Sequence, residues 1–142
     1  METRIVQTIN DIRKALHLDE DNLTTVKIST IPNAGNGLFA NQELKAGDFI
    51  DFYTGEIVYG DLAPEDVDNA YMFHNVKGGF YINAMKGGNR TSIINHSVQP
   101  NCAYKNYKLP DIDVMVPIVV CIKDVQKDQE LLCDYGPKYW KK

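Results

Sequence analysis

The sequence predicts a mostly β protein with a short helix at its N-terminal end. Short stretches rich in β-branched and aromatic residues recur along the chain, and turn residues separate them. After residue 20 there is little helical periodicity, so strands dominate the predicted architecture. The 142 residues correspond to about one domain and are enough to bury a single core.

The composition is that of a soluble globular protein, with 44% hydrophobic and 24% charged residues. The net charge of −4 argues against direct nucleic-acid binding, which normally needs a basic face. No membrane segment is expected, because the longest apolar run, residues 114–122, is too short to cross a bilayer. The N-terminus also lacks the apolar region of a secretory signal peptide.

Three cysteines stand at positions without metal-binding spacing. Cys102, Cys121 and Cys133 form neither a C-x-C nor a C-x-x-C pattern, so we expect no zinc site and no disulfide framework. Free thiols are typical of a reducing cytosol, which favours a cytoplasmic location.

The first expected element is an amphipathic helix over residues 2–18. Ile5, Ile9, Ile12 and Leu16 recur at spacings of four, three and four, which places them on one helical face. We expect this face to pack on the chain's own domain, with a homodimer or partner interface as the alternative.

Strands and turns are expected to fill the rest of the chain. Residues 45–48 predict a tight turn, residues 110–113 a hairpin loop, and residues 61–68 an acidic loop that either meets a basic peptide or is simply solvated. The expected strands cover residues 26–28, 38–40, 49–53, 80–84, 103–107, 114–122 and 131–133.

Small polar residues follow an apolar pair in the middle of the chain. Ile93 and Ile94 run into Asn95 and His96, and Pro100 marks a turn soon afterwards. Asn and His side chains both donate and accept hydrogen bonds, so this pair could hold the amino group and the base of a nucleoside ligand. The alternative is a polar turn that ends a strand.

These residues also carry a family resemblance. Asn-His-Ser-x-x-Pro-Asn-Cys at 95–102 and Glu-Leu-Leu-Cys-Asp-Tyr-Gly at 130–136 together resemble the signature of SET-domain protein-lysine methyltransferases. The resemblance extends to residues 35–40 and 52–57, so four motifs occur in the family order between about residues 25 and 140.

The resemblance implies a β-clip SET fold with a C-terminal pseudoknot and a short N-terminal helix. In this fold the C-terminal segment threads under a loop and brings residues 95–96 beside residues 134–135, which no sequence pattern reveals. The implied domains are an N-terminal helical extension over residues 1–24 and a SET domain over residues 25–142.

The implied activity is methyl transfer from S-adenosyl-L-methionine to the ε-amine of a protein lysine. The substrate is a lysine-bearing protein or peptide, with a histone tail as one candidate. The alternative is a catalytically silent SET module that binds a peptide or protein partner. Tyr135 and Tyr53 are both present, which favours the enzyme, because silent relatives often lose one of them.

The resemblance also assigns roles to individual residues. Tyr135 is expected to be the central catalytic residue, and Tyr53 and Tyr104 are expected to line the lysine channel. Cys133 is expected in the same channel, where its small size leaves room for added methyl groups; Tyr104 restricts them, so we predict mono- and dimethylation. The implied cofactor-binding residues are Asn36, Gly37, Leu38, Arg90, Asn95, His96, Tyr135 and Trp140.

Several positions depart from the family pattern. Many SET enzymes have a zinc-binding cysteine where this chain has Val98, and no cysteine cluster follows Tyr135, which implies a minimal, zinc-free domain. Ser92 and Ile93 replace a common Arg-Phe pair, and Asn83 replaces an acidic residue. The single-domain form resembles viral and bacterial SET proteins, which adds the host nucleus as a second expected location.

Overall fold

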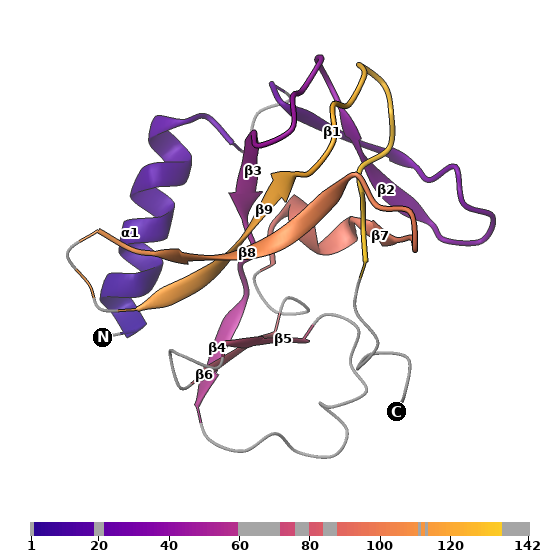
Figure 1. Ribbon diagram of the computed structural model, residues 1–142. Coiled ribbons are helices and arrows are strands. Elements are labelled where there is room, and N and C mark those ends of the chain that lie inside the picture. Colours follow the sequence, from indigo (N-terminus) through magenta and orange to yellow (C-terminus); the bar gives the residue numbers. More distant parts are fainter. Residues whose placement is uncertain are drawn as a thin grey trace.

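The computed structural model describes residues 2–18, 22–59, 72–75, 80–83, 88–110, 112 and 114–134. The described part is mostly β, with one α-helix and three sheets, which confirms the predicted fold class (Figure 1). Within it, no helix combines the length and the apolar character needed to span a membrane. The elements are α1 (Glu2–Ala15), β1 (Thr24–Ile28), β2 (Asn36–Ala40), β3 (Phe49–Phe52), β4 (Glu56–Tyr59), β5 (Met72–Asn75), β6 (Phe80–Asn83), the 3-10 helix η1 (Arg90–Ile93), β7 (Asn95–His96), β8 (Cys102–Lys108), β9 (Met115–Cys121) and β10 (Leu132–Cys133).

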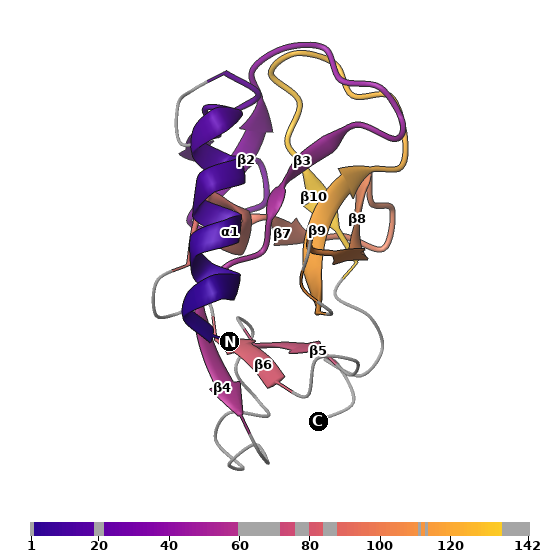
Figure 2. The same ribbon diagram turned by 90° about the vertical axis from the view of Figure 1, so that its left-hand side faces the viewer.

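The helix α1 packs its apolar face on the domain, as expected. Ile5 and Ile9 are buried in a core cluster that also contains residues of β3 and β9, and Ile12 packs against its margin. Figure 2 shows α1 lying alongside β3. The helix and the strands therefore share one core. The predicted domain boundary between residues 24 and 25 stays a prediction.

One residue of the expected helix face does not reach the core. Leu16 was predicted to be buried, but its side chain is 51% exposed because α1 ends at Ala15. His17 adopts a positive φ of 56°, and the Leu18 N–H donates to the carbonyl oxygen of Arg13 at 3.1 Å. This left-handed turn closes the helix and brings Leu18 into a buried position instead.

The largest sheet has five strands in the order β3-β9-β8-β10-β7. β8 and β9 form a long antiparallel hairpin, whereas β10 pairs in parallel with both β7 and β8. Leu132 pairs with Asn95, and Cys133 pairs with both His96 and Cys102. Segments from two distant parts of the sequence therefore meet at this edge. The pseudoknot that the resemblance implies stays a prediction, because strand pairing alone does not establish how the chain threads.

Two further sheets flank this one. β1 and β2 form an antiparallel pair, and β4, β6 and β5 form an antiparallel sheet in that order (Figure 1). The apolar side chains form two core clusters, one beside α1 and one beneath β2. The expected acidic loop at residues 61–68 lies outside the described residues.

Candidate functional site

The two tyrosines predicted to line the lysine channel lie together. The rings of Tyr53 and Tyr104 are 5.8 Å apart between centroids and meet edge to face at 89°. Tyr53 is buried after the end of β3, and Tyr104, on β8, packs against both core clusters. The two side chains form a rigid aromatic corner of the kind that orients an amine and lowers its hydration.

Backbone and side-chain bonds fix Tyr53 in place. Its N–H donates to the carbonyl oxygen of Pro117 at 3.0 Å. Asn89 binds both residues that flank Tyr53. The Asn89 Nδ2 donates to the Phe52 carbonyl oxygen at 2.7 Å, and the Asn89 N–H donates to Thr54 Oγ1 at 3.0 Å. Asn89 also caps η1, so the segment of Tyr53 is tied to the segment that leads to β7.

A second group of residues surrounds the carboxylate of Glu130, which is buried. It accepts hydrogen bonds from Ser29 Oγ at 2.8 Å, from Thr30 N at 2.9 Å and from Thr30 Oγ1 at 2.6 Å. Asn95 Nδ2 donates to Glu130 Oε2 at 3.1 Å. Burial alone would raise the pKa of Glu130, but the hydrogen bonds from Thr30, Asn95 and Ser29 outweigh it and hold the pKa below its ordinary value.

The orientation of the Asn95 amide follows from its partners. Nδ2 also donates to the carbonyl oxygen of Asn36 at 3.1 Å, so both N–H groups face acceptors. Neither a carboxylate nor a carbonyl oxygen can donate, which fixes the amide against a flipped orientation. Asn95 Oδ1 is left to accept a hydrogen bond from a ligand.

Gly37 allows this arrangement by having no side chain. A Cβ at this position would overlap Glu130 Oε2 and come within 3.3 Å of Asn95 Nδ2. Gly37 therefore belongs to the same group of residues as Asn95. Asn36 takes part through its backbone carbonyl, whereas the Leu38 side chain is fully buried in the core cluster beneath β2.

His96 lies next to the last described strand. Its Nδ1 is 3.7 Å from Asp134 Oδ1, and β7 and β10 pair alongside. The structure thus brings the 95–96 segment beside residue 134, as the resemblance implies. Tyr135 and Trp140 lie outside the described residues, so their expected roles stay predictions.

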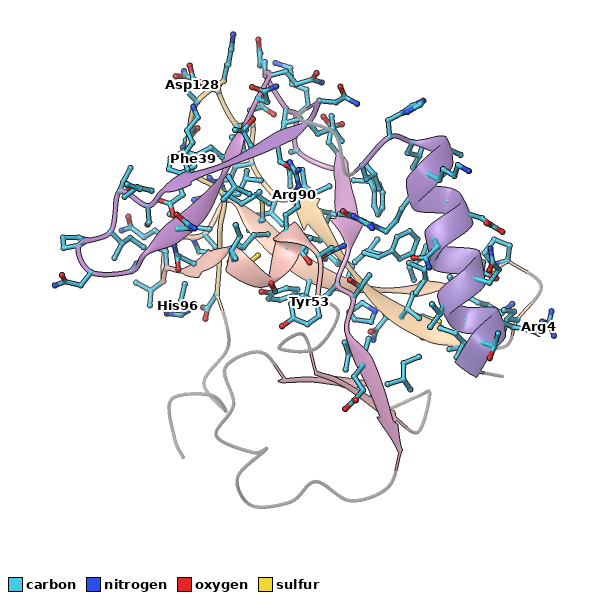
Figure 3. All side chains as sticks on the ribbon, turned by 180° about the vertical axis from the view of Figure 1, so that it is seen from behind. Arg4, Phe39, Tyr53, Arg90, His96 and Asp128 are labelled. Atoms are coloured by element: carbon cyan, nitrogen blue, oxygen red, sulfur yellow. The ribbon has the colours of Figure 1, made fainter. Side chains whose placement is uncertain are left out.

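Two other predicted residues have neighbours within the fold. Arg90 Nη1 donates to the Thr24 carbonyl oxygen at 2.8 Å, and Figure 3 shows Arg90 pointing toward β1 and β2, away from Tyr53 and His96.

Cys133 is fully buried among apolar side chains, in the cluster that also contains Cys102 and Cys121. A hydrogen bond with Cys102, together with burial, raises the pKa of the Cys121 thiol. The expected roles of Arg90 at the cofactor and of Cys133 in the channel stay predictions.

A comparison with protein families identifies this arrangement. Residues 35–136, most of the chain, match the family model of the SET domain. The chain belongs to the SET domain family.

Curated relatives of this SET domain include fungal enzymes. A "Histone-lysine N-methyltransferase, H3 lysine-4 specific" from Chaetomium globosum is 29% identical over 93% of this chain. A protein of the same description from Aspergillus oryzae is 31% identical over 70% of it. This chain spans only 14% and 8% of the lengths of those two relatives.

Solved structures with the same fold include Polycomb assemblies. A structure of ctPRC2 in an autoinhibited conformation bound to S-adenosylmethionine is similar with a TM-score of 0.68 and 26% identity, over 83% of this chain and 16% of that one. An active Polycomb repressive complex 2 in the basal state is similar with a TM-score of 0.70 and 28% identity, over 80% of this chain and 15% of that one. These similarities confirm the predicted SET fold.

The residues of this SET domain fit S-adenosylmethionine. Asn95 Oδ1 can accept from the ammonium of the methionine moiety, because both N–H groups of the amide are used elsewhere. His96 follows Asn95 on β7, and both side chains are half-buried. When bound, the cofactor supplies an activated methyl group on a sulfonium.

Sequence reasoning assigned no role to some residues that organise the SET domain site. Glu130 is the first residue of the 130–136 motif, and Asn89 and Asp51 belong to none of the four motifs. Both acidic residues have a signal in the sequence: Glu130 stands directly before a buried apolar run, and Asp51 stands within a strand rich in aromatic residues. A charge buried in such a place needs partners, so both could have been predicted to organise their surroundings.

Proposed function

We propose that this protein transfers a methyl group from S-adenosylmethionine to the ε-amine of a lysine in a protein substrate. The supporting observation is the pairing of β7 with β10, which puts the Asn95–His96 segment beside Asp134, the residue before Tyr135. The corner formed by the buried Tyr53 and the partly buried Tyr104 provides aromatic walls for a lysine side chain. Membership of the SET domain family supports the same chemistry.

The chemical problem is to present a neutral amine. A lysine with a pKa of about 10.4 is neutral in roughly one molecule per few thousand at pH 7, which corresponds to about 4–5 kcal/mol. Desolvation against the rings of Tyr53 and Tyr104 disfavours the ammonium, and the positive sulfonium acts in the same direction. A strong base is therefore not required, and the remaining task is to align the amine with the methyl group.

We assign the roles as follows. Asn95 and His96 hold the cofactor, and Tyr53 and Tyr104 orient the amine through their rings and hydroxyl groups. Tyr135 accepts weak C–H···O contacts from the transferring methyl group. A histone tail is our candidate substrate, because the curated relatives carry the name of histone-lysine methyltransferases. We further propose mono- and dimethyl products, and a cytoplasmic or host-nuclear location.

The test is a transfer assay with radiolabelled S-adenosylmethionine, core histones and lysate proteins. Labelled protein is expected for the wild type, and Tyr135→Phe is expected to lose most of the rate, because the hydroxyl group beside the methyl is removed. Full activity of Tyr135→Phe would refute its catalytic role. A wild type that binds peptides but neither S-adenosylmethionine nor label would instead identify the catalytically silent module.

Mass spectrometry of the labelled product tests the predicted methylation state. Mono- and dimethyl-lysine are expected, because Tyr104 restricts the channel while Cys133 is small. Exclusively trimethylated lysine would contradict the prediction.

The number of subunits in solution, measured by light scattering, decides between a monomer and a homodimer.

A further inference from the structure

A buried ion pair connects the N-terminal helix to the segment that carries Tyr53. Arg13 Nε lies 2.9 Å from Asp51 Oδ1, and Arg13 Nη2 lies 3.1 Å from Asp51 Oδ2. The two side chains are only 10% and 3% exposed. Two parallel bonds between a guanidinium and a carboxylate fix orientation as well as distance. Because Asp51 stands two residues before Tyr53, the pair sets where α1 lies relative to this segment.

A cavity of about 310 Å³ lies between the same two parts of the fold. Ile9 and Arg13 of α1 line it together with Tyr53, Thr54 and Gly55. The segment of Tyr53 thus meets α1 across a cavity on this side, and the ion pair supplies a directional link beside it.

Stability alone does not explain a pair of this kind. Removing two charges from water costs about as much as their attraction returns, so apolar residues of similar size often stabilise a fold equally well. What apolar residues do not supply is a fixed angle between the two elements. Arg13 and Asp51 therefore contribute geometry more than free energy.

We propose that Arg13 and Asp51 are positioning residues, which hold Tyr53 in the orientation that methyl transfer requires against Tyr104. The helix α1 then positions a residue of the site, although it precedes residue 35, where the match to the family begins. This inference rests on the proposed function and deepens it.

The kinetic test uses a double variant, Arg13→Met/Asp51→Asn, of the full chain. It removes both charges, and Asn at 51 keeps an oxygen to accept from the Phe52 N–H, as Asp51 does at 2.6 Å. The acceptor is the protein that the wild type labels in the transfer assay. With this acceptor, the kcat of the double variant is expected to fall about ten- to a hundredfold. The dissociation constant for S-adenosylmethionine is expected to stay within about twofold, since the Asn95 group is untouched.

A matched control also replaces the cation by Met and the Asp by Asn, but at an exposed ion pair. Lys27 Nζ and Asp128 Oδ1 are 3.3 Å apart, and their side chains are 46% and 63% exposed. Lys27→Met/Asp128→Asn is expected to keep the wild-type kcat, and Asn tolerates the positive φ of 72° at position 128. Arg13→Lys keeps the charge without the planar fork, so its kcat is expected to be intermediate, and it replaces the double variant if that variant does not fold.

A spectroscopic measurement separates this inference from the proposed function. In protein labelled with 3-fluorotyrosine, the ¹⁹F signal of Tyr53, assigned with Tyr53→Phe, is expected to shift or broaden in the Arg13→Met/Asp51→Asn variant and not in the control. An inactive wild type would refute the proposed function while this signal still reports on positioning. An unchanged signal together with an unchanged kcat, in a folded double variant or in Arg13→Lys, would overturn the inference.

Discussion

Glu130 shows how a single buried charge organises its surroundings. Its carboxylate holds Ser29 and Thr30 on one side and the Asn95 amide on the other. Hydrogen bonds to a charged group contribute about 1.5–3 kcal/mol each to stability, more than neutral ones. The predicted cofactor residue Asn95 is thus oriented by a side chain that does not itself need to touch the ligand.

Glu130→Gln tests this role through the pH dependence of stability. The pKa of Glu130 is lowered from 4.5 in the folded state, so its contribution is complete above pH 4.5 and is lost as the pH falls through the folded pKa. At pH 7 the variant is expected to be less stable by about 1–3 kcal/mol. In urea denaturation, the gap between wild type and variant is expected to narrow below pH 4.5. A gap that stays constant down to pH 3 would contradict the assignment.

Gly37→Ala tests how tightly the same group is packed. The new Cβ would overlap Glu130 Oε2, and the carboxylate cannot move without losing its partners. We expect a loss of about 1–3 kcal/mol in the free energy of unfolding and weaker binding of S-adenosylmethionine, measured by calorimetry. In the matching double variant Gly37→Ala/Glu130→Ala the overlap disappears, so the two costs are expected to be non-additive. Additive costs would show that the two sites are independent.

At this scale the motifs predicted some residues and missed others. The family resemblance implied site roles for Tyr53, Tyr104, Asn95 and Gly37, and the structure brings Tyr53 beside Tyr104 and Gly37 beside Asn95. Arg13 could not be predicted to pair with Asp51, since an ion pair between residues far apart in sequence leaves no local pattern.

At the scale of elements, α1 depends on two buried isoleucines. Ile5 is almost fully buried against β3 and β9, whereas Leu16 is half exposed beyond the helix end. Ile5→Ala is expected to lower the free energy of unfolding by about 2–5 kcal/mol because it leaves a cavity. Leu16→Ala, the control, is expected to change it by less than about 0.5 kcal/mol. Equal effects in thermal denaturation would contradict the observed helix end.

Periodicity predicted where most elements lie but not how they pair. The strands at 26–28, 38–40, 49–53 and 114–122 were each found within a few residues of their observed bounds. The two-residue strands β7 and β10 are too short to have a period, and only the family resemblance indicated that they meet. The sequence did not predict the end of α1, because the left-handed turn that closes the helix lies at His17 and not at the Gly or Asn that usually marks such an end.

For the whole molecule, cofactor binding is expected to stabilise the fold. A ligand that binds only the folded state at 100 times its dissociation constant adds about 2.7 kcal/mol. For a chain of this size the melting temperature is expected to rise by about 5–10 °C. Differential scanning fluorimetry with S-adenosylmethionine measures this, and Asn95→Ala is expected to abolish the rise. A rise of the same size with ATP would show that the site does not select the sulfonium cofactor.

The placement of β10 between β7 and β8 sets the order in which this protein matures on the ribosome. Asn95 and His96 emerge from the exit tunnel first and must wait for Leu132 and Cys133, a delay of a few seconds at about 5–20 residues per second. Nascent chains stalled before residue 132 therefore lack the pairing that completes this edge of the five-stranded sheet. The Asn95–His96 segment gains both of its described strand partners in one step, once Leu132 and Cys133 have emerged.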